Sequence, residues 1–151
     1  MATLSYEALA QKAPTVAFVH SFPGPVKSGI ARDTKGLAMF TFKAMFALLG
    51  PLLYIPNEES GERHLYLCTS GRYPAREGVE EAVSVEKNVG VARGTDGAVG
   101  GGVYSVDQNG EGAGVRVREV LAGLREKGVL ETVWKDSEEQ FKRITGEVVM
   151  A

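Results

Sequence analysis

The segment Val16-Ala17-Phe18-Val19-His20-Ser21-Phe22-Pro23-Gly24-Pro25-Val26-Lys27-Ser28-Gly29 decides the fold class of this chain. Residues 15–22 are mostly β-branched and aromatic and almost uncharged, which is typical of a strand buried on both faces between layers of helices. The Pro-Gly-Pro run then ends the strand, because proline has no N–H for a ladder and Pro-Gly favours a turn. The segment therefore predicts an α/β fold with a parallel sheet.

Two helices are expected around this strand. Residues 2–12 (ATLSYEALAQK) are good helix formers, and Pro14 ends that helix because proline disfavours helical geometry in the residue before it. A second helix is expected over residues 57–70, with Asn57 placed to cap its first N–H groups and Gly71 placed to end it. The residues expected to be buried against the sheet are His64, Leu65 or Leu67, and Cys68.

A glycine-rich stretch precedes the next strand. Residues 90–114 hold nine of the nineteen glycines, but neither GxxxxGK[ST] nor GxGxxG between a strand and a helix is present. A phosphate-binding loop is therefore not indicated. We expect a flexible excursion instead, followed by a strand over residues 102–107 and a turn at Asn109-Gly110.

The tail is expected to be helical, with a break at Gly128. An apolar stripe indicates the buried side of these helices, formed by Val115, Leu121, Leu124, Val129 and Leu130. Trp134 is most simply a packing anchor. A last helix is expected over residues 137–144, with Asp136 or Ser137 as its cap and with Phe141 and Ile144 facing the body.

The most hydrophobic segment is residues 36–55, GLAMFTFKAMFALLGPLLYI. It approaches the length of a membrane span, but Lys43 near its middle and the Gly50-Pro51 break argue against one. A buried or lid-like helix that contacts an apolar substrate or a membrane surface is expected instead.

Length and composition indicate one domain over residues 1–151. A net charge of −2 gives no reason to expect nucleic acid as a partner. The single Cys68 excludes an internal disulfide, and with His20 and His64 it stands at no metal-ligand spacing, so no metal site is expected. The N-terminus lacks the pattern of a secretory signal, and the cytoplasm is the expected compartment.

Residues 23–28, PGPVKS, resemble the Pro-Gly-x-Val/Ile-x-Thr pattern that ends the sixth parallel strand of the short-chain dehydrogenase/reductases. In that family the main chain at the valine position bonds the nicotinamide carboxamide, and the hydroxyl two residues later helps to hold the cofactor. The resemblance therefore implies a cofactor-binding role for Pro23, Gly24, Val26 and Ser28, with NAD(P) as the cofactor.

Later segments follow the same template in order. Residues 36–55 resemble the family's substrate-binding region, residues 56–70 its late helix and residues 102–107 its seventh strand. The stretches GERHLYL at 61–67 and the tail at 133–143 look like a fungal-type branch of the family. The implied fold is an incomplete Rossmann-like α/β unit, with few parallel strands flanked by helices.

Two parts of the family's pattern are absent from this sequence. There is no glycine-rich turn after a first strand, and none of the five tyrosines is followed by lysine four residues later, as the Tyr-x-x-x-Lys pair requires. The resemblance covers the family's C-terminal third to half. It implies that the Tyr-x-x-x-Lys pair would lie before Met1, and that residues 2–12 correspond to the second half of the helix that carries this pair. No catalytic residue is therefore assigned in this chain.

Three functions remain open from the sequence. The first is an NAD(P)-dependent oxidoreductase acting on an apolar carbonyl or alcohol, with fungal secondary metabolism as the implied setting. The second is a non-catalytic binding or interaction module that carries no cofactor. The third is a cofactor-free isomerase or cyclase, for which the acid–base candidates are Glu58, Glu59, His64 and Tyr104. In each case a strand with unpaired edges predicts a homo- or hetero-oligomer that covers them.

Overall fold

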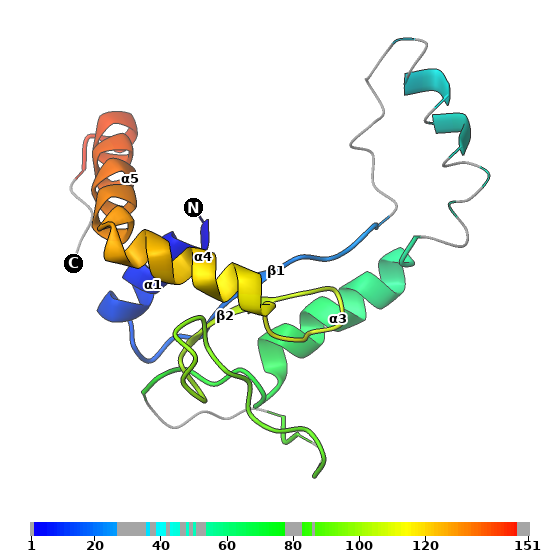
Figure 1. The fold of residues 1–151 in the computed structure, drawn as a ribbon, viewed down its shortest axis with the longest axis horizontal. Coiled ribbons are helices and arrows are strands. Elements are labelled where there is room, and N and C mark those ends of the chain that lie inside the picture. The colour runs from blue at the N-terminus through cyan, green and yellow to red at the C-terminus, as the bar shows by residue number, and fades with distance from the viewer. Residues whose placement is uncertain are drawn as a thin grey trace.

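The expected α/β architecture is confirmed by a computed structural model, which contains two parallel strands flanked by helices (Figure 1). The structure describes residues 2–26, 36, 39–41, 43–45, 48, 50, 54–77, 83–85 and 87–147. The elements are α1 (Ala2–Lys12), β1 (Phe18–Ser21), α3 (Asn57–Thr69), β2 (Val103–Val106), α4 (Val115–Glu126) and α5 (Val129–Thr145).

The two strands pair in parallel, with Phe18 opposite Val103 and Ser21 opposite Val106. Side chains alternate between the faces of a strand, so neighbours in β1 contact different helices. Phe18 stacks on Tyr6 of α1 with ring centroids 6.0 Å apart, whereas Val19 packs with α3 against the core. Helices therefore cover both faces of this small sheet.

The core of the α3 side is a cluster of Tyr73, Tyr104 and Val106. Tyr104 is fully buried, and its hydroxyl donates to the Pro74 carbonyl at 2.6 Å. Gly102, just before β2, has φ +78°, and a Cβ there would lie 2.9 Å from the backbone nitrogen of Arg76. Only glycine fits at this position, which lets the chain enter β2 directly beside the 73–76 segment.

Burial of the two strands differs from the expectation. β1 was expected to be buried on both faces over residues 15–22, but it spans four residues that are half-buried or exposed, while β2 is the more buried strand. The outer edge of β2 is covered, because Thr95 N–H donates to Val103 O at 2.8 Å and Ala113 N–H donates to Ser105 O at 2.7 Å. No strand covers the outer edge of β1 within the part of the chain that the structure describes.

The helix over residues 57–70 is confirmed as α3, but its expected burial and cap are wrong. His64, Leu65 and Cys68 are exposed, and only Leu67 packs against the core. Pro56 occupies the cap position, and no side chain caps this helix. The helix packs through one narrow stripe because, among the described residues, the sheet beneath it has two strands.

The glycine-rich stretch forms defined turns before β2. Gly94 N–H donates to Ala98 O at 2.8 Å and Gly100 N–H donates to Ala92 O at 3.0 Å. The strand expected over residues 102–107 is confirmed as β2, and the Asn109-Gly110 turn is confirmed by Gly110 at φ +73°. These glycines therefore allow the chain to form tight turns before and after β2.

The helical tail is confirmed, with Gly128 in the left-handed conformation between α4 and α5. The separate last helix over residues 137–144 is wrong, because α5 is continuous and the Ser137 hydroxyl donates to Val133 O at 2.8 Å inside it. Phe141 and Ile144 are exposed, so they do not face the body. Trp134 is partly buried, with the Lys12 ammonium 5.2 Å from its ring centroid, in agreement with a packing role.

A partly buried ion pair fixes α1 to α4. Arg125 donates to both carboxylate oxygens of Glu7, at 2.8 and 2.6 Å, and the Glu7 side chain is only 10% exposed. The hydrogen bond to Glu7 is the main cause that raises the pKa of Arg125. The first and last thirds of the chain are thereby joined on the α1 side of the sheet.

Nine of the twenty residues of the apolar segment over residues 36–55 lie outside the described residues. Within the described part, residues 39–41 and 43–45 are helical and stand away from the sheet beyond the N-terminal end of α3 (Figure 1). Phe40 and Leu48 are 69% and 79% exposed, so the prediction of a buried helix is wrong for these two residues. In the described part of the chain, no helix is both long enough and apolar enough to cross a bilayer.

We expect Leu4→Ala to lower the free energy of unfolding by about 2–5 kcal/mol, because Leu4 is fully buried and its truncation leaves a cavity. Leu65→Ala is the matched control, since Leu65 is 63% exposed and should change stability by less than about 1 kcal/mol. Urea unfolding followed by Trp134 fluorescence measures both. Equal midpoints for the two variants would contradict the packing of α1 on the sheet.

Candidate functional site

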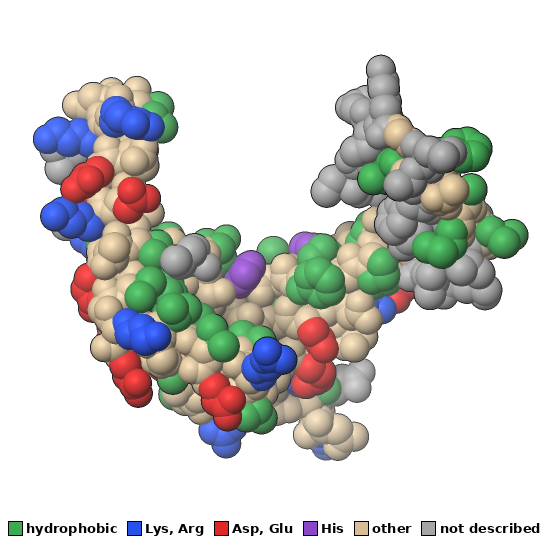
Figure 2. Space-filling model, turned by 45° about the horizontal axis from the view of Figure 1, so that its top comes forward, with side chains coloured by type: hydrophobic (Ala, Val, Ile, Leu, Met, Phe, Trp, Pro, Cys, Tyr) green, Lys and Arg blue, Asp and Glu red, His purple; other side chains and the backbone are tan. Residues whose placement is uncertain are grey.

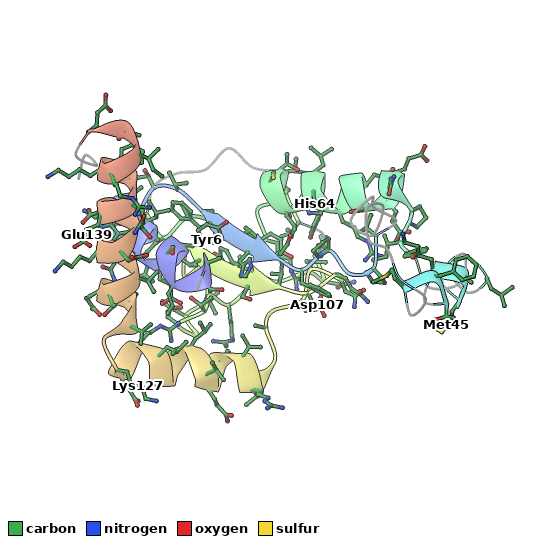
Figure 3. All side chains as sticks on the ribbon, turned by 90° about the horizontal axis from the view of Figure 1, so that it is seen from above. Tyr6, Met45, His64, Asp107, Lys127 and Glu139 are labelled. Atoms are coloured by element: carbon green, nitrogen blue, oxygen red, sulfur yellow. The ribbon has the colours of Figure 1, made fainter. Side chains whose placement is uncertain are left out.

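A pocket of about 400 Å³ lies where both strands end. In parallel sheets the carboxyl ends of the strands meet at one edge, and this edge is where α/β proteins bind ligands. Figure 3 labels His64 on α3 and Asp107 after β2, which both line it. The lining residues come from three segments: Ser21, Phe22 and Pro23; Ser60, Glu62, Arg63, His64, Tyr66 and Leu67; and Asp107, Gln108, Asn109 and Gly110.

The turn after β2 forms one wall of the pocket, and Asp107 organises it. Its Oδ1 accepts hydrogen bonds from Asn109 N–H at 2.8 Å and from Glu111 N–H at 3.0 Å. Tyr73 donates its hydroxyl to the Gly110 carbonyl at 2.6 Å from the core side. The Asp107 carboxylate is therefore engaged in building the wall.

Arg63 joins the opposite wall to this turn. Its guanidinium donates to the Gln108 carbonyl and, at 2.5 Å, to Glu59 one helical turn earlier. The positive charge of Arg63 is thus balanced within α3. This contact sets the width of the pocket between α3 and the turn.

His64 and Ser21 meet at the mouth of the pocket. His64 Nδ1 lies 2.6 Å from the Ser60 carbonyl, and its Nε2 lies 3.5 Å from the Ser21 hydroxyl. Figure 2 shows histidine side chains, in purple, along the hollowed side of the molecule. This site therefore combines a hydroxyl and an imidazole at the carboxyl end of β1.

The structure brings only part of the expected cofactor segment to the pocket. Pro23 lines it, whereas Gly24 lies behind it with φ +75°, and a Cβ there would come within 2.2 Å of the Gln108 Oε1 atom. Val26 is bridged to Ile55, and its N–H donates to the Gly24 carbonyl at 3.0 Å. Ser28 lies outside the described residues.

Of the four acid–base candidates, only His64 lines the pocket. Glu59 is paired with Arg63, and Tyr104 is fully buried with its hydroxyl on Pro74 O. Sequence reasoning missed the pairing of Ser21 with His64. Its one available signal was the position of Ser21 at the end of a strand, where a side chain reaches a ligand edge.

Metal binding is not indicated at this site. In the described ranges, no three His, Cys, Asp or Glu side chains come together in a way that would hold a metal ion. Cys68 is exposed on α3 and does not line the pocket.

Together, the two parallel strands and their helices form a small α/β unit with a pocket at the carboxyl ends of its strands. Three curated fungal proteins resemble it. The chain is 34% identical over 142 residues to oxidoreductase AN1596 of Emericella nidulans, covering 91% of this chain and 41% of that protein. It is 31% identical over 149 residues to oxidoreductase andH of Emericella variicolor, covering 97% and 43%.

The third relative is the NmrA-like family domain-containing oxidoreductase notO of an Aspergillus species, 33% identical over 141 residues, covering 93% of this chain and 37% of that protein. The chain thus spans about two fifths of the length of the curated relatives it matches. No protein-family model and no solved structure matches it. The expected similarity to fungal oxidoreductases is confirmed, and the narrower resemblance to short-chain dehydrogenase/reductases stays a prediction.

We expect Tyr73 to make stability fall at alkaline pH, because burial raises its pKa above the usual value. The unfolded chain loses the tyrosine proton near pH 10 while the folded chain keeps it. This contribution is complete below about pH 10 and is lost as the pH rises through the folded pKa. Tyr73→Phe should remove that alkaline loss and, at pH 7, cost about 0.5–1.5 kcal/mol through the hydrogen bond to Gly110.

Urea unfolding between pH 7 and 11 measures this effect. Tyr66→Phe is the control, since Tyr66 is 44% exposed and contacts the Tyr73 ring edge-on. An unchanged alkaline slope in Tyr73→Phe would contradict the assignment.

Proposed function

We propose that this chain forms the nicotinamide-side and substrate-side part of an NAD(P)-dependent oxidoreductase of the short-chain type, acting on an apolar carbonyl or alcohol. The observation that carries the proposal is the pocket at the carboxyl ends of two parallel strands, lined by Pro23 of the Pro-Gly turn. The oxidoreductase names of the relatives support it independently. The resemblance adds secondary metabolism as the setting, and the single cysteine supports the cytoplasm as the compartment.

The pocket residues fit the nicotinamide end of such a cofactor. A volume of about 400 Å³ lies in the range of small-molecule sites. Gln108 and Asn109 line it and carry amide groups, which both donate and accept hydrogen bonds as a carboxamide does. Phe22 and Leu67 supply apolar walls for a ring. A bound nicotinamide ring supplies hydride transfer, and this chain's residues bind and orient it.

The described residues do not fit the pyrophosphate at this pocket. The first turn of α3 carries Glu58 and Glu59, whose charges oppose an anion at that helix end. We therefore assign the diphosphate to a segment outside the pocket, in keeping with a chain that spans about two fifths of its relatives. For Val26 to meet the carboxamide through its N–H, that N–H must first leave the Gly24 carbonyl.

We expect purified protein to bind NADH or NADPH saturably, with a dissociation constant below about 1 mM, equivalent to about −4 kcal/mol. Gly24→Ala should weaken this binding about tenfold, because its Cβ would lie 2.2 Å from the Gln108 Oε1 atom and would displace this pocket-lining amide. Gly61→Ala is the control, since its Cβ meets no atom within 4 Å. Fluorescence titration measures all three proteins, and absence of saturation with both nucleotides up to about 1 mM would contradict the proposal.

We also propose that a second polypeptide adds to the outer edge of β1. Parallel pairing with β2 uses the N–H groups of Phe18 and Phe22, so Val19 and Ser21 turn their backbone groups to the other edge. A groove of about 720 Å³ runs beside that edge, and its apolar lining includes Val16, Leu67 and Val83. Val16 and Val83 are 47% and 65% exposed, which favours coverage by another chain.

We expect the isolated chain to be oligomeric or poorly soluble in size-exclusion chromatography with light scattering. Val16→Lys should shift it toward monomer, because a lysine at an edge opposes strand addition. Val120→Lys is the matched control on α4, where Val120 is 55% exposed. A monomeric wild type that unfolds cooperatively would exclude the oligomer.

A further inference from the structure

We propose that Ser21 and His64 form an acid–base pair in this pocket, in which Ser21 exchanges a proton with the substrate oxygen and His64 Nε2 takes or returns it. The pair joins the carboxyl end of β1 to the middle of α3, with Ser21 Oγ 3.5 Å from His64 Nε2. Both side chains line the pocket. The inference rests on the proposed function, to which it adds an acid–base pair formed within this chain.

The other ring nitrogen fixes the chemical form of His64. A carbonyl oxygen only accepts hydrogen bonds, so the 2.6 Å contact with Ser60 O requires a proton on Nδ1. In the neutral imidazole Nε2 then carries the lone pair, and it accepts from the Ser21 hydroxyl. A base held in this tautomer by its second nitrogen is the arrangement that activates a hydroxyl.

His64 is the ionisable group of the pocket that lies next to the Ser21 hydroxyl, at 3.5 Å. The other ionisable groups that line it are Glu62, Arg63 and Tyr66 on α3 and Asp107 after β2. Arg63 is bound to Glu59 and Gln108, and Asp107 accepts two backbone N–H groups. The separation of 3.5 Å suits a pair that tightens when a substrate enters, as catalytic hydrogen bonds in empty sites often do.

A second hydroxyl–imidazole pair provides an internal comparison. Thr3 Oγ1 lies 2.8 Å from His20 Nδ1, on the α1 face of the sheet. His20 contacts Tyr6 edge-on at 6.0 Å between ring centroids and does not line the pocket. Because side chains alternate along β1, Ser21 turns to the pocket where His20 turns away from it.

The proposed step balances in the direction of alcohol oxidation. The substrate hydroxyl proton passes to Ser21 Oγ while the Ser21 proton passes to His64 Nε2, giving an imidazolium. An oxidised nicotinamide bound at this pocket would take the hydride with its electron pair from the substrate carbon, and the substrate C–O bond would become a carbonyl. Because His64 is exposed, it releases its proton to water, and reduction runs the same path in reverse.

Nitrogen-15 NMR of the imidazole rings tests the pair without any nucleotide. We expect the Nδ1–H form of His64 to predominate at neutral pH, and Ser21→Ala to shift the His64 Nε2 resonance while leaving His20 unchanged. A predominant Nε2–H form of His64, or a spectrum unaffected by Ser21→Ala, would overturn the pair. His64→Asn and His20→Asn assign the two rings.

A base-catalysed probe gives a second readout. In 5-nitrobenzisoxazole, removal of the C–H proton by a base breaks the N–O bond and yields a coloured phenolate. We expect His64→Asn to lower this conversion at least about a hundredfold, the low end for general-base catalysis, and His20→Asn to leave it unchanged.

Equal rates in wild type and His64→Asn would overturn the pair. Thermal unfolding of each variant verifies its fold. Since neither measurement uses a nucleotide, failure of the pair is distinguishable from failure of cofactor binding in the fluorescence titration.

Discussion

The parallel pairing of β1 with β2 is the constraint on which the rest of the structure depends. Phe18 N–H donates to Gly102 O at 2.8 Å and Phe22 N–H to Val106 O at 2.9 Å, joining segments that lie about 84 residues apart in the chain. A parallel pair cannot be closed by a tight turn, so the connection must carry a helix back across the sheet. Here α3 does so, and it completes the pocket with the two strand ends.

The outer edges of the two paired strands differ in how they are covered. The outer edge of β2 is covered by its own glycine-rich loop and by residues 111–113, which explains why β2 is the more buried strand. β1 has no such neighbour among the described residues, although residues 15–22 around it have the composition expected of a strand inside a sheet. A sequence suited to the middle of a sheet at an uncovered edge is a conflict between local and global signals, and such conflicts are resolved when another chain is added.

Local sequence signals were sufficient to predict where most helices, strands and turns lie, but they were insufficient to predict which side chains are buried. Pro14, Gly128 and the Asn109-Gly110 turn act on their immediate neighbours, so their effects on the backbone were predictable. The exposure of Leu65 and Ile144 depends on how many strands and helices lie opposite, which a single helix's periodicity does not contain. Ser137 resembled a cap in sequence, but its hydroxyl bonds back to Val133 within a helix that begins earlier, at Val129.

The pocket residues likewise fall into those that a local sequence pattern predicts and those that only the tertiary fold brings together. Pro23 was predictable because a Pro-Gly turn at a strand end is a local pattern, and it does line the pocket. The meeting of Ser21 with His64 was not, because 43 residues separate them and only the α3 crossover brings them together.

The Gly24–Val26 turn and the Ser21–His64 pair also differ in whether their polar atoms are already hydrogen-bonded within the chain. Val26 N–H is already engaged by Gly24, whereas His64 Nε2 faces Ser21 at a distance that a substrate can shorten. The proposed acid–base pair is therefore built from contacts within the chain. The proposed cofactor contact at Val26, in contrast, would depend on opening the Gly24–Val26 turn, which a ligand or a covering strand at β1 would favour if it bound the open form more tightly.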